Sequence, residues 1–437
     1  MSVSSTPASD RGASGAVPWT PCWLPGLIPG RRGRREASLE PVKASFLARP
    51  AFKADPYPFY ARMREEAPVF RVSMPLPGRF WLLTRYDDIV AMLKDERLSR
   101  DLLAKLPWFP GFARPLLDNM LGREPPDHGR LRKLVSMAFT PRRIDELRGE
   151  VERVCEDLLS AAPSGRPFDL VADYALPLPL TIIAKLLGVP AEDRRRFHVL
   201  VRGSLPIGVP TGSLLDVPLA LPYVWQLMRY FRGLFAERRL RPRDDLFSAL
   251  VQAEVAGDRL SADELLGTAI LLVAAGYETT VHLIASGALA LLQNPDERAR
   301  FVEGPGLVDS AIEELLRFTS PVEMSTPRIA LEDIAFASVT IPKGSLVSGV
   351  LGSANRDESQ FVEPNRLDLG REPNKHVAFG VGHHFCLGAS LARLEARIAL
   401  TTLFRRRPAL RLAQPAESLR WRKALPLRAL TALPVTS

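Results

Sequence analysis

Cysteine and histidine are scarce in this sequence. Three cysteines (Cys22, Cys155 and Cys386) and six histidines are spread over 437 residues. An odd number of widely spaced cysteines does not suggest a disulfide framework and fits a reducing compartment, so we expect a cytoplasmic protein. The chain also lacks the second Cys or His pair at regular spacing that a zinc site needs.

Long apolar runs are missing as well. No run reaches the ~18 residues that a membrane span requires, and the best candidate, residues 265–292, carries Glu278 and His282 in its middle. The apolar opening segment contains four prolines and precedes its arginines, which is the reverse of a signal peptide. We therefore expect neither a signal peptide nor a membrane span.

Acidic residues are fewer than basic ones, 49 against 58, for a net charge of +9. Nucleic-acid binders concentrate such an excess in stripes with aromatic platforms. Here most basic residues are mixed with acids, so we expect no nucleic-acid partner. Denser groups occur at residues 31–35, 194–196 and 405–407. They are interpreted as solvated surface, with a basic docking face for an acidic protein as the alternative.

The remaining composition is that of a soluble globular protein, with 46% hydrophobic and 24% charged residues. Residues 1–44 are rich in Ser, Gly, Pro and Arg without any periodicity, so we expect a disordered extension. Residues 45–437 show no linker or repeat and are predicted to form one domain. Helical periodicity dominates, with strand patterns at residues 69–72, 80–84 and within 322–351. The predicted fold is mainly α with a small β portion.

The longest helical pattern crosses the middle of the sequence. It begins at a capping box formed by Ser261 and Glu264 and runs to Asn294, where Pro295 ends it. A helix of this length spans roughly 45–50 Å. Its centre, AAGYETT at residues 274–280, contains a glycine, a glutamate and two threonines. These are poor choices for a buried helix and indicate a functional site.

Cys386 lies in the stretch AFGVGHHFCLGAS, residues 378–390. The neighbouring glycines let a planar group approach the backbone closely, and free backbone N–H groups stabilise a thiolate. An anionic sulfur in such a loop is a metal-ligand arrangement. A small buried hydrophobe is the alternative for a lone cysteine. A zinc site built from His383, His384 and Cys386 lacks the further ligands that zinc requires.

Residues 379–388, FGVGHHFCLG, resemble the heme-binding signature of the cytochrome P450 family. Every fixed position of the signature is filled, namely Phe379, Gly380, Gly382, His384, Cys386 and Gly388. AAGYETT is similar to the family's oxygen-activating helix motif, and residues 128–142 are similar to its heme-facing helix. EELLR contains the family's Glu-x-x-Arg pair at Glu314 and Arg317. The four motifs follow the family's order, and the resemblance covers residues 45–430.

The resemblance implies a cytochrome P450 fold, a single large domain around a buried heme b. Cys386 would be the axial ligand and the metal-binding residue. Propionate contacts would come from His128, Arg132, Arg328 and His384, and further heme contacts from Phe379, Gly380 and Ala275. Thr279 would organise water at the oxygen site, bonding the Ala275 carbonyl as a helical threonine can, and Glu278 would feed in protons. Glu314, Arg317 and, further along, Arg366 would form a structural charge cluster.

The implied function is a monooxygenase that inserts one atom of O2 into a lipophilic small molecule by hydroxylation or epoxidation. We expect a terpenoid, steroid, fatty acid or macrolide-like substrate, NAD(P)H electrons from a separate ferredoxin and ferredoxin reductase, and a monomer. The apolar, proline-broken stretches at 98–126 and 204–225 would be substrate lids. Pocket walls would include Leu271, Ala274, Ala275, Val322 and Met324. The alternatives are a peroxide-using or non-oxygenating member and a heme-thiolate sensor, neither of which needs the Thr279–Glu278 pair.

The redox partner would dock on basic residues close to the heme motifs. The candidates are Arg130, Lys133, Arg142, Arg143, Arg393 and Arg397.

Overall fold

The computed structural model describes residues 40–437, apart from residues 75–77, 103–110, 209–215 and 256. The predicted extension therefore falls mostly outside the described residues. Its last part is structured, because Val42–Lys43 form strand β1, which pairs in parallel with β2 (Val69–Ser73). The ordered domain begins a few residues before the predicted start at residue 45.

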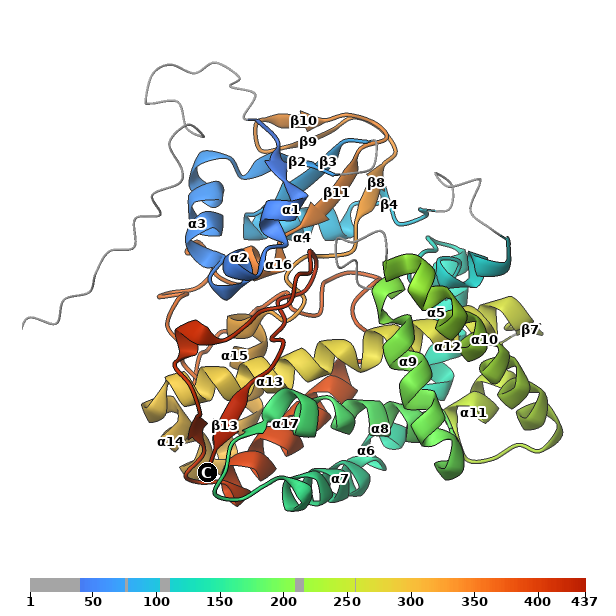
Figure 1. Ribbon diagram of the computed structural model, residues 1–437. Coiled ribbons are helices and arrows are strands. Elements are labelled where there is room, and N and C mark those ends of the chain that lie inside the picture. Colours follow the sequence, from blue (N-terminus) through green and yellow to red (C-terminus); the bar gives the residue numbers. More distant parts are fainter. Residues whose placement is uncertain (1–39, 75–77, 103–110, 209–215, 256) are drawn as a thin grey trace, which may run out of the picture. The chain divides into compact units, whose positions relative to one another are not determined.

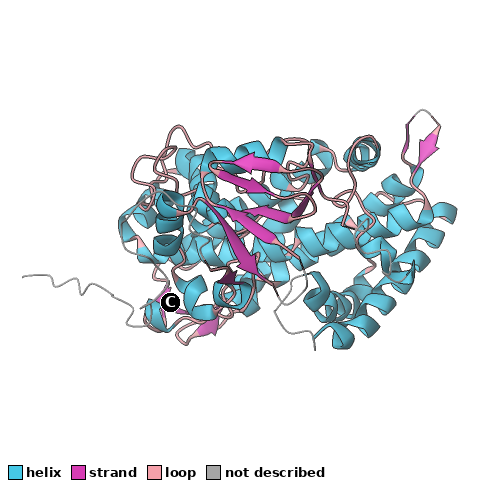
Figure 2. Cartoon of the chain, turned by 90° about the horizontal axis from the view of Figure 1, so that it is seen from above, coloured by secondary structure: helices cyan, strands magenta, loops and turns pink. Residues whose placement is uncertain are grey.

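A six-stranded mixed sheet gathers strands from both ends of the chain (Figures 1 and 2). Its order is β1, β2, β3 (Phe80–Leu83), β11 (Leu346–Gly349), β8 (Arg328–Ala330) and β4 (Leu98–Ser99). Successive side chains of a strand point to opposite faces. Accordingly, Leu82 packs with the cluster around helices α1 to α3, whereas Leu83 packs with residues of α4.

Smaller β elements lie outside this sheet. They are the pair β9 (Ile334–Phe336) and β10 (Val339–Ile341), the pair β6 (Glu254–Val255) and β7 (Asp258–Arg259), and the sheet of β12 (Arg411–Leu412), β13 (Pro434–Thr436) and β5 (Phe168–Asp169).

Helices make up most of the described chain, which confirms the predicted fold class. The first half contains α1 (Ala44–Leu47), α2 (Pro50–Ala54), α3 (Tyr57–Glu66), α4 (Tyr86–Lys94), η2 (Gly111–Leu116), α5 (Asp127–Ala138), α6 (Pro141–Asp145), α7 (Arg148–Ala161), η3 (Val171–Ala175), α8 (Pro177–Leu186), η4 (Ala191–Asp193) and α9 (Arg194–Gly208). The second half contains α10 (Asp216–Leu240), α11 (Leu246–Gln252), α12 (Ala262–Gly276), α13 (Glu278–Gln293), α14 (Pro295–Glu303), η5 (Pro305–Leu307), α15 (Val308–Thr319), α16 (Leu351–Ala354), α17 (Ala389–Arg406) and η6 (Ala416–Ser418).

The predicted long helix is two helices, α12 and α13, which follow one another across the domain in Figure 1. The capping box of Ser261 and Glu264 is present at its start, but the helix is interrupted at Tyr277. Residues 262–293 taken together are long and apolar enough to cross a membrane, yet 61% of the most apolar window is buried inside the protein. α13 packs against α15 and α17, as expected of the core helix of a globular domain.

The two predicted lid stretches are only partly irregular. Residues 204–225 were expected to be broken by prolines, but α9 continues to Gly208 and α10 begins at Asp216. Pro218 lies in the first turn of α10, where a missing N–H costs nothing, and Pro222 lies inside the helix. Within residues 98–126, the described part contains β4 and η2, and residues 103–110 lie outside it.

Candidate active site

The cysteine loop precedes α17 and is shaped by two glycines. Gly380 and Gly382 have φ values of 69° and 79°, a left-handed conformation that other residues adopt only with strain. The Cys386 N–H donates to the Phe379 carbonyl at 3.0 Å, which closes the loop. The Phe379 ring lies below the guanidinium of Arg393, 4.6 Å from ring centroid to Cζ. The sulfur is thereby held in a fixed frame just before a helix.

The thiol of Cys386 is exposed, although it lies among protein atoms. Burial by these atoms raises its pKa, while the Gly388 N–H and the charges of Arg132 and Arg393 act in the opposite direction. Arg132, on α5, also donates to the Phe385 carbonyl at 2.8 Å. The sulfur therefore has the partners that stabilise an anion, and an open side at which a ligand can reach it.

The break between α12 and α13 exposes backbone and small side chains inside a core helix. The Thr279 hydroxyl donates to the Ala275 carbonyl at 2.8 Å, which confirms the predicted bond, and Thr280 bonds Gly276 at 3.1 Å. Such side-chain hydrogen bonds compete with the backbone hydrogen bonds of the helix and bend it. Ala274 and Ala275 are exposed although the flanking turns are buried. A space open to solvent therefore reaches this point of the helix.

Glu278 is buried beside the break and belongs to a polar cluster. Its Oε1 accepts from Arg422 at 2.6 Å and lies 3.7 Å from His282 Nε2. Burial would raise the pKa of Glu278, but His282 and Arg422 outweigh it and lower that pKa. Among the described residues, Glu278 Oε2 and both ring nitrogens of His282 have no hydrogen-bond partner. Buried polar atoms of this kind are usually satisfied by ordered water. Neither His282 nor Arg422 was predicted. The helical spacing of Glu278 and His282 was the available signal, whereas Arg422 is remote in sequence.

Buried basic groups gather near the cysteine loop. Arg328 donates through its Nη atoms to the carbonyls of Met92 and Leu93, at 3.3 and 2.9 Å. Burial and the nearby charge of Arg328 lower the pKa of Arg100 to about 9. In the described part of the chain, Arg100 Nε, Arg328 Nε and His384 Nε2 are buried without a hydrogen-bond partner. Arg100 was not predicted to be a site residue, because it follows β4 in a stretch that was predicted to be a substrate lid.

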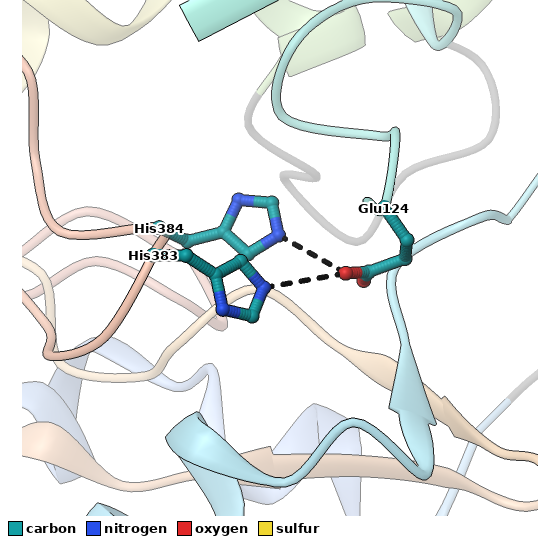
Figure 3. Close-up of side chains that lie close together, drawn as sticks. All are labelled: Glu124, His383 and His384. Carbon is teal, nitrogen blue, oxygen red and sulfur yellow. Dashed lines mark hydrogen bonds and ion pairs between the residues drawn. The ribbon is translucent and has the colours of Figure 1, made fainter. Parts of the chain in front are cut away.

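Glu124 faces the two histidines of the loop (Figure 3). Its Oε2 lies 3.4 Å from His383 Nε2 and 3.5 Å from His384 Nε2. Burial would raise the pKa of Glu124, but His384 and the Arg100 N–H lower it to about 2. His128, buried on α5, packs its ring 4.1 Å from that of His384. Among the described residues, Glu124, His383 and His384 bring together side-chain atoms that could bind a metal ion, but Cys386 is not part of this group. The structure therefore does not support a zinc site built from His383, His384 and Cys386.

Comparison with known proteins agrees with this geometry. A profile described as Cytochrome P450 matches residues 306–407. Cytochrome P450 107B1 of Saccharopolyspora erythraea is 44% identical, over 88% of this chain and 96% of the relative. The chain belongs to the cytochrome P450 family.

Solved P450 structures confirm the fold. PksS, the cytochrome P450 of the Bacillus subtilis bacillaene polyketide synthase, superposes with a TM-score of 0.84 at 40% identity, covering 89% of this chain and 98% of that one. The myxobacterial cytochrome P450 CYP267B1, solved with myristic acid, gives 0.82 at 45% identity, with 89% and 98% covered. The protein is therefore a cytochrome P450 monooxygenase, and its cofactor is heme.

The residues present fit a heme. A heme presents two carboxylates, and Arg100 Nε and Arg328 Nε are buried donors without a hydrogen-bond partner in the described chain. His384 Nε2 makes no hydrogen bond there either, but it lies 3.5 Å from Glu124 Oε2. The charge of Arg328 lowers the pKa of Arg100, and buried cations so close together need anions nearby. Arg132 and His128 lie on α5 beside the same loop.

The predicted charge cluster exists, but with a different third member. Arg317 pairs with Glu314 at 2.7 Å, both fully buried. The further arginine is Arg371, whose Nε lies 3.2 Å from Glu314, and not Arg366. Arg366 is exposed and pairs with Glu363 at 2.8 Å. Both arginines follow α15 in an irregular segment, where no periodicity shows which side chain turns inward.

Most of the basic residues predicted for redox docking are neutralised by acids. Arg142 pairs with Glu146, Arg143 with Asp244, Arg393 with Glu313, Arg397 with Asp309, and Arg130 with Glu264 and Asp258. Lys133 is exposed and has no ion pair in the described chain. The positive field on this face of the P450 is consequently weaker than the sequence suggested.

Proposed function

We propose that this P450 inserts one oxygen atom into a lipophilic small molecule, with Cys386 as the ligand of the heme iron. The observation that carries the proposal is the cysteine loop, whose exposed sulfur has the N–H of Gly388 and two arginines around it. When bound, the heme supplies O2 activation, and an electron-rich thiolate ligand favours cleavage of the O–O bond.

Heme binding is assigned to side chains around that loop. Arg100, Arg328 and His384 donate to the propionates, and Arg132 and His128 support them from α5. Phe379 and Gly380 pack beside the sulfur, and Ala275 leaves space on the oxygen side. This assignment accounts for the buried donors that have no partner in the described chain. It adds Arg100 to the residues predicted from sequence.

Proton supply is assigned to Thr279 and Glu278. The Thr279 hydroxyl, bonded to the Ala275 carbonyl, positions a water in the space beside the helix break. Glu278 receives protons from solvent along the side of Arg422, whose side chain is 32% exposed, and releases them toward Thr279. This pair is not needed by the peroxide-using and sensor alternatives.

The substrate is proposed to be a fatty acid, polyketide or macrolide-like molecule, with a terpenoid or steroid still compatible. Support comes from two similar P450s, one belonging to a polyketide synthase and one solved with myristic acid. Leu271 and Val322 are half-buried and Ala274 is exposed, which suits an apolar wall. Met324, also predicted for that wall, is buried.

Electrons are proposed to come from NAD(P)H through a ferredoxin and its reductase, in a cytoplasmic monomer. A groove of about 240 Å³ between α6 and α17 includes Arg393, Arg397 and Arg148. These arginines are paired with Glu313, Asp309 and Asp145, so the groove supplies a concave surface of mixed charge on the side of α17, close to the cysteine loop.

The test combines a spectrum with a product balance. Protein loaded with heme should give the red-shifted ferrous carbonyl band of thiolate ligation, and Cys386→Ser should lose it. With a surrogate ferredoxin and reductase, a library of lipophilic compounds is screened through the spin-state change of the heme band. Thr279→Ala should then convert most of the reducing equivalents to peroxide. A Thr279→Ala enzyme that stays fully coupled would show that the proton assignment is wrong.

A further inference from the structure

Helices α9 and α10 carry an unusual concentration of arginine. Residues 194–232 contain six arginines, no lysine and one acidic residue, Asp216. This segment of 39 residues contributes +5 to a net charge of +9 for the whole chain. The arginines are Arg194, Arg195, Arg196, Arg202, Arg229 and Arg232. The proposed function assigns no role to them.

Most of these arginines keep their charge uncompensated. Arg195, Arg202, Arg229 and Arg232 are exposed, and no carboxylate pairs with them in the described part of the chain. Arg229 instead stacks over the Trp225 ring, 4.8 Å from Cζ to the centroid. On the face beside α17, by contrast, most arginines have acidic partners. The positive charge is therefore less compensated on α9 and α10 than on the face beside α17.

Apolar groups lie among these charges. Trp225 and Val199 are each 55% exposed, and Leu219 is 72% exposed. A groove of about 480 Å³ runs between α9 and α10, with Arg195, Arg196, Val199, Tyr223 and Gln226 along it and Glu192 at its end. The Tyr223 ring lies against Gly203, where a Cβ would be only 2.3 Å away, so the two helices approach closely below the groove.

We propose that this arginine groove is a docking surface for an acidic protein that inserts an apolar side chain between α9 and α10. Protein interfaces are enriched in Trp, Tyr and Arg and depleted in Lys, which is the composition found here. A concave site with apolar walls suits a side chain, whereas a flat bilayer does not fill it and a nucleic-acid backbone has no apolar group to place there. Helix-in-groove recognition has this form.

The surface is separate from the one proposed for the ferredoxin. The groove beside α17 shares none of its residues with the arginine groove. Residues 204–225, the stretch predicted to cover the substrate, include the end of α9 and the start of α10, so a partner on this surface would contact that stretch directly, for example at Tyr223. The inference goes beyond the proposed reaction and does not depend on the identity of the heme ligand.

The test uses a fluorescein-labelled, helical peptide that has a leucine stripe flanked by glutamates. Binding to the heme-loaded enzyme is followed by anisotropy at low and moderate salt. Arg195→Glu combined with Arg196→Glu, both in the wall of the groove, should weaken binding at least about tenfold, and added salt should act in the same direction. Replacing the peptide leucines by serine should also cost at least about tenfold, since the burial of the leucine side chains is lost.

The matched control is Arg411→Glu combined with Arg420→Glu. Both residues are exposed arginines without a carboxylate partner in the described chain, and they lie outside α9 and α10. This control should bind the peptide like the wild type. Equal losses in both double variants, or no dependence on the peptide leucines, would overturn the proposal in favour of general electrostatics. Binding to phosphatidylglycerol vesicles through the same arginines, without binding of the peptide, would overturn it in favour of a membrane surface.

Discussion

Replacing Glu395 by glutamine should make the stability of this P450 less sensitive to pH. Glu395 lies on α17, 2% exposed, and its Oε2 has no hydrogen-bond partner among the described residues. Burial raises the pKa of this carboxyl from 4.5 to about 8. Burial is the cause of this shift, and no basic neighbour in the described chain offsets it. The folded protein therefore holds the proton at neutral pH, whereas the unfolded chain releases it.

The sign and size of the effect follow from proton linkage. Between pH 4.5 and about 8 the folded state binds more protons than the unfolded state, so the free energy of unfolding falls as the pH rises. Each pH unit in this window removes about 1.4 kcal/mol. The loss is about 3 kcal/mol at pH 7 and approaches about 5 kcal/mol above pH 8. Glu395→Gln cannot ionise, so it should match the wild type in acid and exceed it by these amounts at higher pH.

Urea unfolding followed by circular dichroism measures this difference. Wild type and Glu395→Gln are compared below pH 4.5, near neutrality and above pH 8. Glu152→Gln is the control, because Glu152 is exposed on α7, and its difference from wild type should stay flat. Infrared spectra should show a protonated carboxyl band at neutral pH that Glu395→Gln lacks. A constant stability difference between Glu395→Gln and wild type across the whole range would refute the reasoning.

Three further variants test the site. Arg371→Leu should lower the free energy of unfolding by about 1–3 kcal/mol, since Glu314 keeps Arg317 but loses a charged hydrogen-bond donor. Arg366→Leu should cost less than about 0.5 kcal/mol; parallel urea titrations would contradict this if the two losses were equal. Gly382→Ala should lower the free energy of unfolding by about 1–2 kcal/mol, because alanine adopts a φ of 79° only with strain. The same strain should disturb the cysteine loop, so an unchanged heme content and ferrous carbonyl spectrum would contradict this prediction. Arg422→Gln removes a charge that lowers the pKa of Glu278, so the pH profile of coupling should move to higher pH; a profile that stays in place would show that Arg422 does not act on Glu278.

Local chemistry made part of this structure predictable. The pattern YDDIVAMLK predicts a helix with the bounds of α4, Tyr86–Lys94. The capping box of Ser261 and Glu264 marks the start of α12, and the Thr279 bond to the Ala275 carbonyl forms as predicted. In each case the deciding interaction joins residues no more than four positions apart. Neighbours so close are fixed by helix geometry, whatever the rest of the chain does.

Long-range packing made the remainder unpredictable. Arg371 rather than Arg366 reaches Glu314, and Arg422 reaches Glu278 across 144 positions of sequence. Arg100 lies beside Arg328 and His384 only because β4 places it there. Residues 216–225 were expected to be irregular from their prolines, yet α10 forms there because its interior side chains pack into the core. Tertiary contacts override local propensity in such cases.

The charged clusters around the cysteine loop explain how an irregular segment can hold Cys386 in place. Unlike a helix or a strand, this loop has no repeating hydrogen bonds to fix its shape. The segment before it is anchored where Asn374 donates to Glu314 at 3.1 Å. The residues that flank the loop are anchored by Glu313, which pairs with Arg393 at 2.6 Å and with His376 at 3.0 Å. Consecutive glutamates of α15 thus hold two sides of the loop. The desolvation cost of these carboxylates is offset by their hydrogen-bonded partners, and the pairs fix the loop that carries Cys386, so substitutions there should alter heme binding before they alter the chemistry at Thr279.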